Sequence, residues 1–492
     1  MKNKKTKNAS GKSFNSCPVL AAVAAGLYPL LFYYSRNFTL INSWAHLVFF
    51  IAVFLICPIV LFVLANKLFT ISALRKWQKY LLPFLNILVF LFLLKVCLYA
   101  GIQKKITLGI LVLAVGISFF LYKYFKKFII LEFILAFIAL LTLVPVIIKN
   151  VSYSSAWTEQ PDAIKEVVFK QKPNVYYIQP DGYVNFSELK QGSYKIDNVA
   201  FETFLNTNNF KNYPDFRSNY ASTLSSNSAT FMMKHHYYNK GTSLSEALNA
   251  RNIIISENPV LSAFKNNGYK THFITERPYL LLNRPKMGYD FSNFTYAEVP
   301  YISTGLKNQK QVFSTLKNKI EEDQNTPKFF FIEIFEPGHI KNTTSASEGK
   351  KEEKENWKLK LDEANKKLIK LVKIIKQDDP EGLILIMADH GGYVGMEYAE
   401  EYLTKTQNRD KIYSMFSSNL SIYWPNQNIP EFDTKIKTSV NVFRVLFTYL
   451  SKDKKYLDNL QEDNSYIILN KDAPKGVYKY IDNSGNITFK KH

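Results

Sequence analysis

The first 150 residues alternate long apolar stretches with short polar connections. Five apolar stretches occupy residues 18–35, 43–65, 80–100, 107–122 and 128–148. An α-helix rises about 1.5 Å per residue, so about 20 apolar residues span the hydrocarbon core of a bilayer. Three stretches reach that length, and the first and fourth are slightly shorter. The pattern predicts an N-terminal bundle of five transmembrane helices within residues 1–149.

Basic residues are concentrated on alternate sides of these stretches. They are Lys2, Lys4, Lys5, Lys7 and Lys12 in the N-terminal tail, Lys67, Arg75, Lys76 and Lys79 in the second loop, and Lys123, Lys126 and Lys127 in the fourth. The intervening loops carry only Arg36, and Lys104 with Lys105. Because cytoplasmic loops are enriched in Lys and Arg, we expect a cytoplasmic N-terminus and an external location for the chain after residue 149.

Two features of this region have an alternative interpretation. The basic start and the small residues at 21–25 are also typical of a cleaved signal peptide, but four further apolar stretches follow directly and favour a retained helix. Lys95 and Glu132 fall inside predicted spans, where charged groups are functional candidates by default. Lys95 has a long side chain that reaches toward an interface, and Glu132 lies near a cytoplasmic end, so structural roles are favoured for both.

After a polar connector at residues 150–172, the hydrophobic pattern becomes that of an α/β domain, residues 173–492. Short apolar runs bounded by Gly or Pro predict strands at 175–178, 268–274, 328–335 and 383–388. Helical spacing of apolar residues occurs at 201–208 and 351–377. Strands that alternate with helices predict a mostly parallel sheet sandwiched by helices. The turn sequence at 483–485 predicts a small C-terminal antiparallel addition.

Composition narrows the class of protein. The only cysteines, Cys17, Cys57 and Cys97, lie in or beside the predicted membrane region, so the external domain has no disulfide, thiolate ligand or cysteine nucleophile. The net charge is +21, which outside a membrane attracts anionic headgroups or phosphorylated glycans. A lysine-rich genome composition explains the excess equally well. Nucleic acid is not an expected partner for this topology.

Candidate catalytic residues lie at the predicted strand ends. Asp181, His339 and the pair Asp389-His390 each follow an apolar run, where open α/β sheets keep their active sites. Carboxylate and imidazole groups are ordinary ligands of zinc or manganese. A hydroxyl-rich segment at 220–230 adds a potential nucleophile, and together these groups suit metal-assisted phosphoryl or sulfuryl transfer. A helix cap at Asp389 and a loop role for His390 are the alternative.

The ordered set of motifs resembles one protein family. The matching segments are 174–183, 218–226, 268–274, 336–339, 388–391 and 440–444. In this order they resemble the alkaline phosphatase superfamily, and within it the sulfatase-like membrane branch that includes lipoteichoic acid synthases and lipid A phosphoethanolamine transferases. The similarity extends from residue 174 to about 450, and a five-span anchor also fits that branch.

The resemblance implies roles for individual residues. Asp181, Asp389 and His390 match metal ligands, and Thr223 matches the nucleophile, which also touches the metal and forms a phosphothreonine intermediate. His339 matches a residue that binds substrate or protonates the leaving group. The Thr-x-x-Ser pattern adds Ser226 as a substrate-binding residue. Ser222, Ser225 and Ser226 stay open as alternative nucleophiles.

The departures from the family pattern are also informative. Formylglycine sulfatase chemistry needs a residue that can be oxidised to formylglycine, with an arginine shortly after it. This domain has no cysteine, and no arginine follows Thr223 within reach, so that chemistry is not expected. His492 is the only histidine after His390, so a second metal site would have to recruit His339, His235, His236 or His272. We therefore expect one divalent cation, manganese, with zinc and magnesium as alternatives. His235 and His236 are candidates for substrate binding or a structural pair, and His272 is expected to be structural.

These observations predict a multi-pass protein of the cell inner membrane with its catalytic domain on the periplasmic side. It would transfer a phospho-headgroup, of the phosphoethanolamine or phosphoglycerol type, from a phospholipid donor to a cell-surface glycan or glycolipid. A sulfatase-like hydrolase or phosphodiesterase is the alternative within enzymes. A catalytically idle scaffold for envelope assembly is the alternative outside them.

Overall fold

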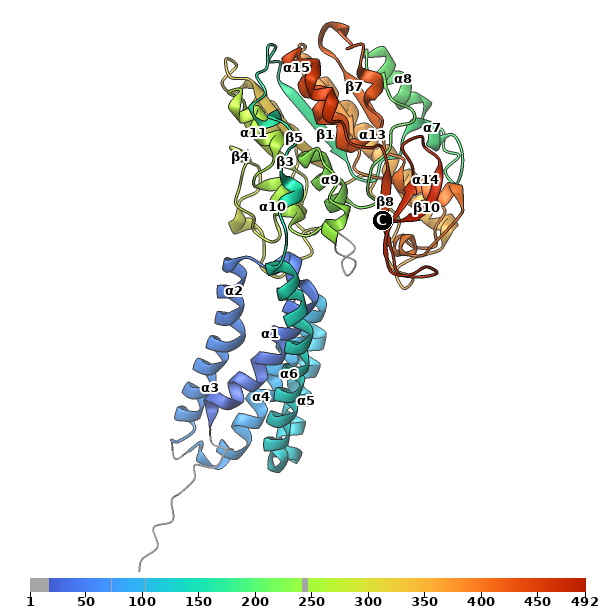
Figure 1. Cartoon of the computed structure of the whole chain (residues 1–492). Helices are drawn as coiled ribbons and strands as arrows, with labels where there is room; N and C mark the ends of the chain where they lie inside the picture. The colour runs from blue at the N-terminus through green and yellow to red at the C-terminus, as the bar shows by residue number, and fades with distance from the viewer. Residues whose placement is uncertain (1–16, 72, 102, 241–246) are drawn as a thin grey trace, which may run out of the picture. The chain divides into compact units, whose positions relative to one another are not determined.

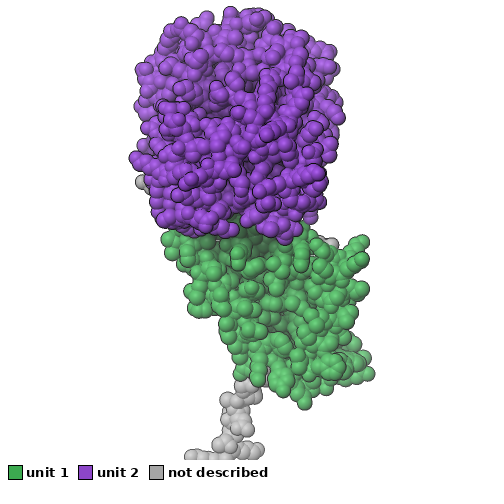
Figure 2. All heavy atoms as spheres, turned by 90° about the vertical axis from the view of Figure 1, so that its right-hand side faces the viewer, with its two compact units in different colours: residues 1–152, 282–284, 300–304 green, residues 153–281, 285–299, 305–492 purple. Residues whose placement is uncertain are grey.

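The computed structural model describes residues 17–71, 73–101, 103–240 and 247–492 (Figure 1). The chain divides into two compact units, which are coloured separately in Figure 2. Unit 1 comprises Met1–Ser152 with two short segments, Leu282–Arg284 and Pro300–Thr304. Unit 2 comprises the remaining residues up to His492. The basic residues predicted to orient the N-terminal tail lie outside the described residues.

Unit 1 is helical. Its helices are α1 (Pro18–Ile41), α2 (Trp44–Ile51), α3 (Cys57–Leu68), α4 (Gln78–Tyr99), α5 (Lys104–Leu121) and α6 (Phe125–Val151), with a π-helical turn, Ala52–Ile56, between α2 and α3. Within the described residues, four helical runs are long and apolar enough to cross a membrane: Pro18–Ile41, Trp44–Leu68, Arg75–Tyr99 and Lys104–Thr158. The last run contains both α5 and α6. The count of five spans is therefore not confirmed.

The surface of unit 1 is apolar where a soluble protein would be polar. Phe120 is 82% exposed, and Leu64, Phe137 and Ile148 are also exposed. A surface of this kind is stable in contact with lipid chains rather than water.

The two charged side chains inside this unit make local contacts. The Asn86 side-chain amide donates hydrogen bonds to a carboxylate oxygen of Glu132 (2.8 Å) and to the backbone oxygen of Ala21 (2.9 Å), so it joins α4 to α6 and α1. Lys95 Nζ donates to Thr107 Oγ1 of α5 (2.8 Å). Polar contacts between apolar helices hold them together, so the geometry fits the structural roles favoured from the sequence.

A seven-stranded sheet forms the centre of unit 2. Its strands are β1 (Val175–Pro180), β2 (Lys211–Asn212), β3 (Lys270–Thr275), β4 (Phe291–Ser292), β5 (Lys328–Ile334), β6 (Leu383–Met387) and β7 (Leu420–Tyr423). Their order is β2-β7-β6-β1-β5-β3-β4. The pairs among β6, β1, β5, β3 and β4 are parallel, while β7 is antiparallel to β6 and β2 to β7. The predicted mostly parallel sheet is confirmed.

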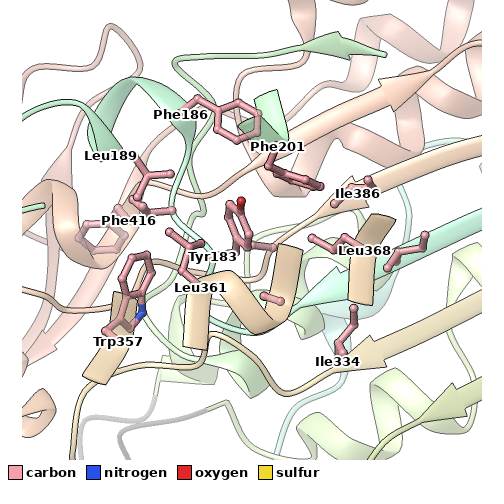
Figure 3. Close-up of a cluster of buried hydrophobic side chains, with 14 of the residues drawn as sticks. Tyr183, Phe186, Leu189, Phe201, Ile334, Trp357, Leu361, Leu368, Ile386 and Phe416 are labelled. Carbon is pink, nitrogen blue, oxygen red and sulfur yellow. The ribbon is translucent and has the colours of Figure 1, made fainter. Parts of the chain in front are cut away.

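Helices cover both faces of the sheet because its strands are apolar on both sides. One face packs against α8 (Val199–Thr207), α12 (Phe313–Glu321), α13 (Lys350–Asp378) and α14 (Arg409–Phe416). In that layer, Trp357, Leu361 and Leu368 of α13 gather with Ile334 of β5 and Ile386 of β6 (Figure 3).

Aromatic rings make many of the contacts on the other face of the sheet. It packs against α9 (Thr223–Met232), α11 (Pro259–Asn266) and α15 (Val442–Ser451). Tyr177 of β1 contacts Phe231 of α9 and Phe443 of α15, with ring centroids 6.1 and 5.8 Å apart. Phe264 of α11 stacks on Phe329 of β5 at 4.2 Å. These contacts fix α9, which carries the hydroxyl-rich segment, against the central strand.

A second, three-stranded sheet ends the chain. It consists of β8 (Ser465–Leu469), β9 (Gly476–Ile481) and β10 (Ile487–Lys491), paired antiparallel in the order β10-β9-β8. The turn between β9 and β10 contains Gly485 at φ +89°, a left-handed conformation that glycine adopts readily. The predicted C-terminal antiparallel addition is present. Two short helices, α7 (Phe186–Leu189) and α10 (Ala250–Ile255), complete the unit.

Candidate metal and nucleophile site

The candidate ligands meet because their strands are neighbours in the sheet. β1 ends immediately before Asp181, and β6 ends shortly before Asp389 and His390. The two strands pair in parallel, with Ile178 opposite Ile386, so their carboxyl ends open at the same edge. One ligand atom from each of Asp181, Asp389 and His390 lies within 4.8 Å of the others.

The geometry of these three residues suits a cation. His390 Nε2 is 3.5 Å from Asp181 Oδ1 and 3.4 Å from Asp389 Oδ2. Both carboxylate oxygens are buried and have no hydrogen-bond partner. Leaving a buried carboxylate without a partner is costly. Two carboxylates and one imidazole are a donor set that binds manganese or zinc, so the residues present fit one divalent ion.

Backbone groups hold the ligands in this orientation. Asp389 Oδ1 accepts hydrogen bonds from the backbone N–H groups of Gly182 (3.1 Å) and His390 (3.0 Å), which leaves Oδ2 directed at the imidazole. His390 Nδ1 lies 2.8 Å from the carbonyl oxygen of Gly391. A carbonyl oxygen only accepts, so Nδ1 carries a proton and the lone pair of Nε2 is free to bind a metal in the neutral ring.

The electrostatics of the cluster reflect two crowded carboxylates. Burial raises the pKa of Asp181, and the neighbouring Asp389 carboxylate raises it further. Burial alone would lower the pKa of His390, but Asp389 and Asp181, with the Gly391 carbonyl, raise it above its ordinary value. A proton on His390 therefore compensates the carboxylates when no cation does so.

Thr223 is the first residue of α9 and the hydroxyl that the structure brings to the cluster. Its Oγ1 lies 3.3 Å from His390 Nε2. The preceding residue, Ser222, makes no side-chain hydrogen bond to the first turn of the helix. The N–H groups and positive dipole end of α9 are thus available to phosphoryl oxygens beside the Thr223 hydroxyl.

The alternative hydroxyls have different surroundings. Ser225 is fully buried, and its Oγ accepts a hydrogen bond from the backbone N–H of Ala247 (3.1 Å). Ser226 is also fully buried, and its Oγ has no hydrogen-bond partner. Ser222 Oγ is buried without a partner. Thr223 is the one of the four with a hydrogen bond to a candidate metal ligand.

His339 lies beside the cluster, on the loop that follows β5. Its ring centroid is 6.0 Å from that of His390 and 5.4 Å from that of Tyr393. Nδ1 lies 2.7 Å from the carbonyl oxygen of Ile340, so it carries the ring proton. Burial, and next the charge of His390, lower the pKa of His339 to about 4. His339 is therefore neutral near pH 7, with Nε2 as a hydrogen-bond acceptor.

A pocket of about 410 Å³ opens beside His339 and contains cations that sequence reasoning missed. Lys341 and Lys360 line it, together with Glu348, Glu353, Asn356 and Trp357. The positive charge of Lys360 partly offsets the rise in the pKa of Asp181 and contributes to the lowered pKa of His339. Lys360 lies in a lysine-rich helix, α13, and nothing in the sequence distinguishes it from its exposed neighbours.

The other histidines make contacts with the protein itself. His236 Nε2 bonds to the backbone oxygen of Ser225 (2.8 Å), and its Nδ1 accepts from the Tyr238 N–H (2.7 Å). His235 Nε2 bonds to the backbone oxygen of Glu462 (2.8 Å), and its Nδ1 pairs with the Tyr220 hydroxyl (3.2 Å). All four ring nitrogens are thus engaged in the fold, which agrees with the structural-pair interpretation. His272 of β3 stacks on Phe330 in the sheet.

Among the comparisons with known proteins, the one with solved structures found similar proteins. No family model matches the chain, and no curated protein matches it. Among solved structures, the C-terminal periplasmic domain of EptC from Escherichia coli is 14% identical, covering 63% of this chain and 93% of its own, with a TM-score of 0.44. The integral membrane lipooligosaccharide phosphoethanolamine transferase A (EptA) of Neisseria meningitidis is 15% identical, covering 88% and 95%, with a TM-score of 0.40. The lipoteichoic acid synthase LtaP of Listeria monocytogenes is 12% identical, covering 66% and 91%, with a TM-score of 0.41.

The three structures are similar to the chain over 63–88% of its length. Because the identities are low and the TM-scores are below 0.5, the function below is inferred from the residues of the site rather than from the likeness.

His390 also contacts the ring of Tyr393, which the motifs did not reveal. The Tyr393 ring stacks on His390 with centroids 5.5 Å apart, and its backbone is left-handed, at φ +59°. It follows two glycines, and a Cβ on Gly391 would meet the Ser414 carbonyl oxygen at 2.2 Å. The glycines after Asp389-His390 were the only sequence signal of this tight loop.

Proposed function

We propose that this protein is a membrane-anchored, metal-dependent phosphotransferase that moves a phospho-headgroup, of the phosphoethanolamine or phosphoglycerol type, to a cell-surface glycan or glycolipid. The observation that carries the proposal is the position of the Thr223 hydroxyl. It lies at the N-terminus of α9 and 3.3 Å from His390 Nε2, beside two buried carboxylate oxygens that accept no hydrogen bond.

The side chains have distinct roles in this reaction. Asp181, Asp389, His390 and Thr223 would hold one divalent ion, manganese or alternatively zinc or magnesium, which when bound lowers the hydroxyl pKa and neutralises charge on the phosphoryl group. Thr223 Oγ1 forms a bond to phosphorus in line with the leaving lipid alkoxide, whose bond to phosphorus breaks, and a phosphothreonine results. The acceptor hydroxyl then attacks the same phosphorus and releases Thr223.

The groups around Thr223 bind and orient the phosphoryl group. The N–H groups at the start of α9 lie beside the nucleophile and suit equatorial phosphoryl oxygens. His339 is neutral near pH 7 and offers Nε2 as an acceptor, which favours substrate binding over protonation of the leaving group. Lys360, in the pocket next to His339, supplies a cation for an anionic part of a substrate.

The apolar helices of unit 1 explain why such a domain would be anchored. We infer a multi-pass inner-membrane protein whose catalytic domain is periplasmic, as the loop charges predict. An anchor restricts the enzyme to the surface where phospholipid donors are concentrated, which raises their effective concentration at the site. Membrane and phospholipid are thus the proposed partners on the donor side.

The test is mass spectrometry of the purified chain after incubation with manganese and mixed phospholipids. We expect a headgroup adduct on Thr223, whose mass identifies the donor, and no adduct in Thr223→Ala. Ser222→Ala is the matched control and should keep the adduct. An adduct on another residue, or on none during turnover, would contradict the phosphothreonine. Release of free headgroup with every acceptor tried would instead indicate the hydrolase alternative.

A further inference from the structure

A second pocket of unit 2 is lined by none of the metal-site residues. It has a volume of about 620 Å³, and its walls come from residues 185, 187, 188, 191, 213–217, 409, 413, 417, 434, 436, 437 and 483–485. We name it the Arg217 pocket after its buried cation. Pockets of this size accommodate small-molecule ligands.

Arg217 has one donor, Nε, that the protein does not use. Its side chain is buried, with the residue 7% exposed. Nη2 donates to the backbone oxygens of Asp463 and Asp482, the latter at 2.9 Å. Nε is buried without a hydrogen-bond partner. Arg217 also forms no ion pair with a carboxylate among the described residues. A buried guanidinium with an unpaired donor is costly unless an acceptor arrives.

A second unpartnered group lies in the same wall. Ser417, at the end of α14, is 1% exposed, and its Oγ has no hydrogen-bond partner. The pocket therefore contains two polar side chains, each more than nine-tenths buried, with hydrogen-bonding capacity left unsatisfied by the protein. Both observations point to a polar ligand.

The charged side chains that line the pocket have a positive balance. Arg409 is neutralised by Glu188, since the two side chains are 2.6 Å apart. Lys437 is exposed and forms no ion pair with any described carboxylate. Asp215, also exposed, is the other carboxylate in the lining. The Asp463 and Asp482 carboxylates also act on Arg217, but they lie outside the lining and accept hydrogen bonds from other groups. Within the lining, two cations without an ion-pair partner face one unpaired carboxylate, which favours an anionic group on the ligand.

The uncharged lining has the chemistry of a sugar site. It offers hydroxyl, amide and aromatic side chains, among them Ser187, Gln191, Tyr213, Phe216, Tyr413 and Thr434. Amides and hydroxyls donate to and accept from ligand hydroxyls, while aromatic rings cover apolar faces. We propose that the Arg217 pocket binds an anionic sugar, that is, a saccharide unit bearing a phosphate or a carboxylate.

The pocket is separate from the metal site but shares a helix with its surroundings. The backbone oxygens of Met415 and Ser414 of α14 accept hydrogen bonds from the N–H groups of Gly391 (2.9 Å) and Tyr393 (3.2 Å), on the loop that follows the metal ligands. α14 thus forms one wall of the pocket and supports that loop. The binding of an anionic sugar here does not depend on the phosphotransfer proposed for Thr223.

The test measures binding to the full-length purified protein in detergent by isothermal titration calorimetry. The probes are glucose 6-phosphate, glucuronate, glucose and inorganic phosphate, so that the first two distinguish a phosphate from a carboxylate. Lys437→Glu is the test variant because the side chain is exposed and unpaired. Lys435→Glu is the matched control, since Lys435 is exposed and close in sequence but does not line the pocket.

We expect at least one anionic sugar to bind more tightly than both glucose and inorganic phosphate. Lys437→Glu should weaken that binding at least about tenfold, while Lys435→Glu should match the unmodified chain. Binding should also persist in Asp389→Asn, which alters only the metal site. The proposal is overturned if no anionic sugar binds, if both lysine variants behave alike, or if Asp389→Asn abolishes binding that Lys437→Glu leaves intact.

Discussion

Replacing Asp389 by asparagine tests the metal site most directly, because the two side chains have nearly the same shape. The backbone N–H groups of Gly182 and His390 that bond to Oδ1 will still find an oxygen in the side-chain amide of the variant. What changes is Oδ2, the buried oxygen that faces His390 Nε2 at 3.4 Å without a hydrogen-bond partner. An amide NH₂ group at that position has no lone pair or charge for a cation, so metal affinity should fall steeply while the fold persists.

The size of the effect follows from binding linkage. A metal at one hundred times its dissociation constant stabilises the folded state by about 2.7 kcal/mol. For a large domain this raises the unfolding temperature by about 5 °C. Without metal, the asparagine variant should be about as stable as the unmodified protein. The substitution removes the repulsion between the Asp389 and Asp181 carboxylates, but it also removes the attraction between Asp389 and a protonated His390, so the two effects offset each other.

The assay is thermal unfolding of the purified chain in EDTA and in manganese, zinc or magnesium. The unmodified protein should gain about 5 °C with the ion that it binds, and the asparagine variant should gain almost nothing. Asp433→Asn is a suitable control: Asp433 is buried, accepts from the Tyr213 hydroxyl (3.0 Å) and lies outside the candidate ligands. It should lower stability equally with and without metal. A metal-induced shift that survives Asp389→Asn would refute the assigned ligand.

Other consequences can be measured separately. Thr223→Ala should reduce turnover by at least about 10³-fold, while Asp181, Asp389 and His390 should retain most of the metal-induced thermal shift. Retained turnover would remove Thr223 as nucleophile. Metal affinity should be constant at high pH and should fall as the pH drops through the raised pKa of His390, because protons compete with the metal for Nε2. Below that pKa the fall should be about tenfold per pH unit. A flat profile from pH 8 to 5.5 would contradict His390 as a ligand. Lys360→Gln should raise KM about tenfold with little change in kcat. Lys358 is exposed and lies outside the pocket, so Lys358→Gln should leave KM unchanged. Equal effects of the two substitutions would exclude Lys360 from substrate binding. Gly182→Ala should destabilise the protein by about 2 kcal/mol or more in chemical denaturation, because φ is +63° and the new Cβ would meet the Gly338 carbonyl oxygen at 2.2 Å.

The sheet was largely predictable because its strands are buried on both faces. Apolar runs such as 383–387 are recognisable as strands without any knowledge of the neighbouring strands. Candidate ligands that follow two such runs lie at the same edge of the sheet when the two strands are parallel. The order of the strands was not predictable, since β1 and β6 pair across more than 200 residues of intervening chain. The short strand β7 was missed because its antiparallel pairing with β6 is set by tertiary contacts, not by its own pattern.

The roles of individual site residues depend on details that a sequence does not contain. His339, His390, His235 and His236 are the same residue type, and their difference lies in which ring nitrogens the fold engages. His390 and His339 each use only Nδ1, on a neighbouring backbone carbonyl, so Nε2 stays available. His235 and His236 use both nitrogens within the fold. Motif spacing gave the candidate positions, and the contacts show which of these histidines keep a ring nitrogen available for a cation or a substrate.

The loop that carries His339 is positioned by the same backbone that positions Asp181. The Gly338 N–H donates to the Asp181 carbonyl oxygen at 2.8 Å, and the Gly338 carbonyl oxygen accepts from Trp357 Nε1 at 2.8 Å. Asp181 and His339 are thus joined through backbone hydrogen bonds rather than through their side chains, which remain free for a cation and a substrate. Trp357 is anchored in the core formed by α13 (Figure 3). The distance between the candidate metal site and His339 is therefore set by the packing of the sheet against this helix, and not by the mobility of a surface loop.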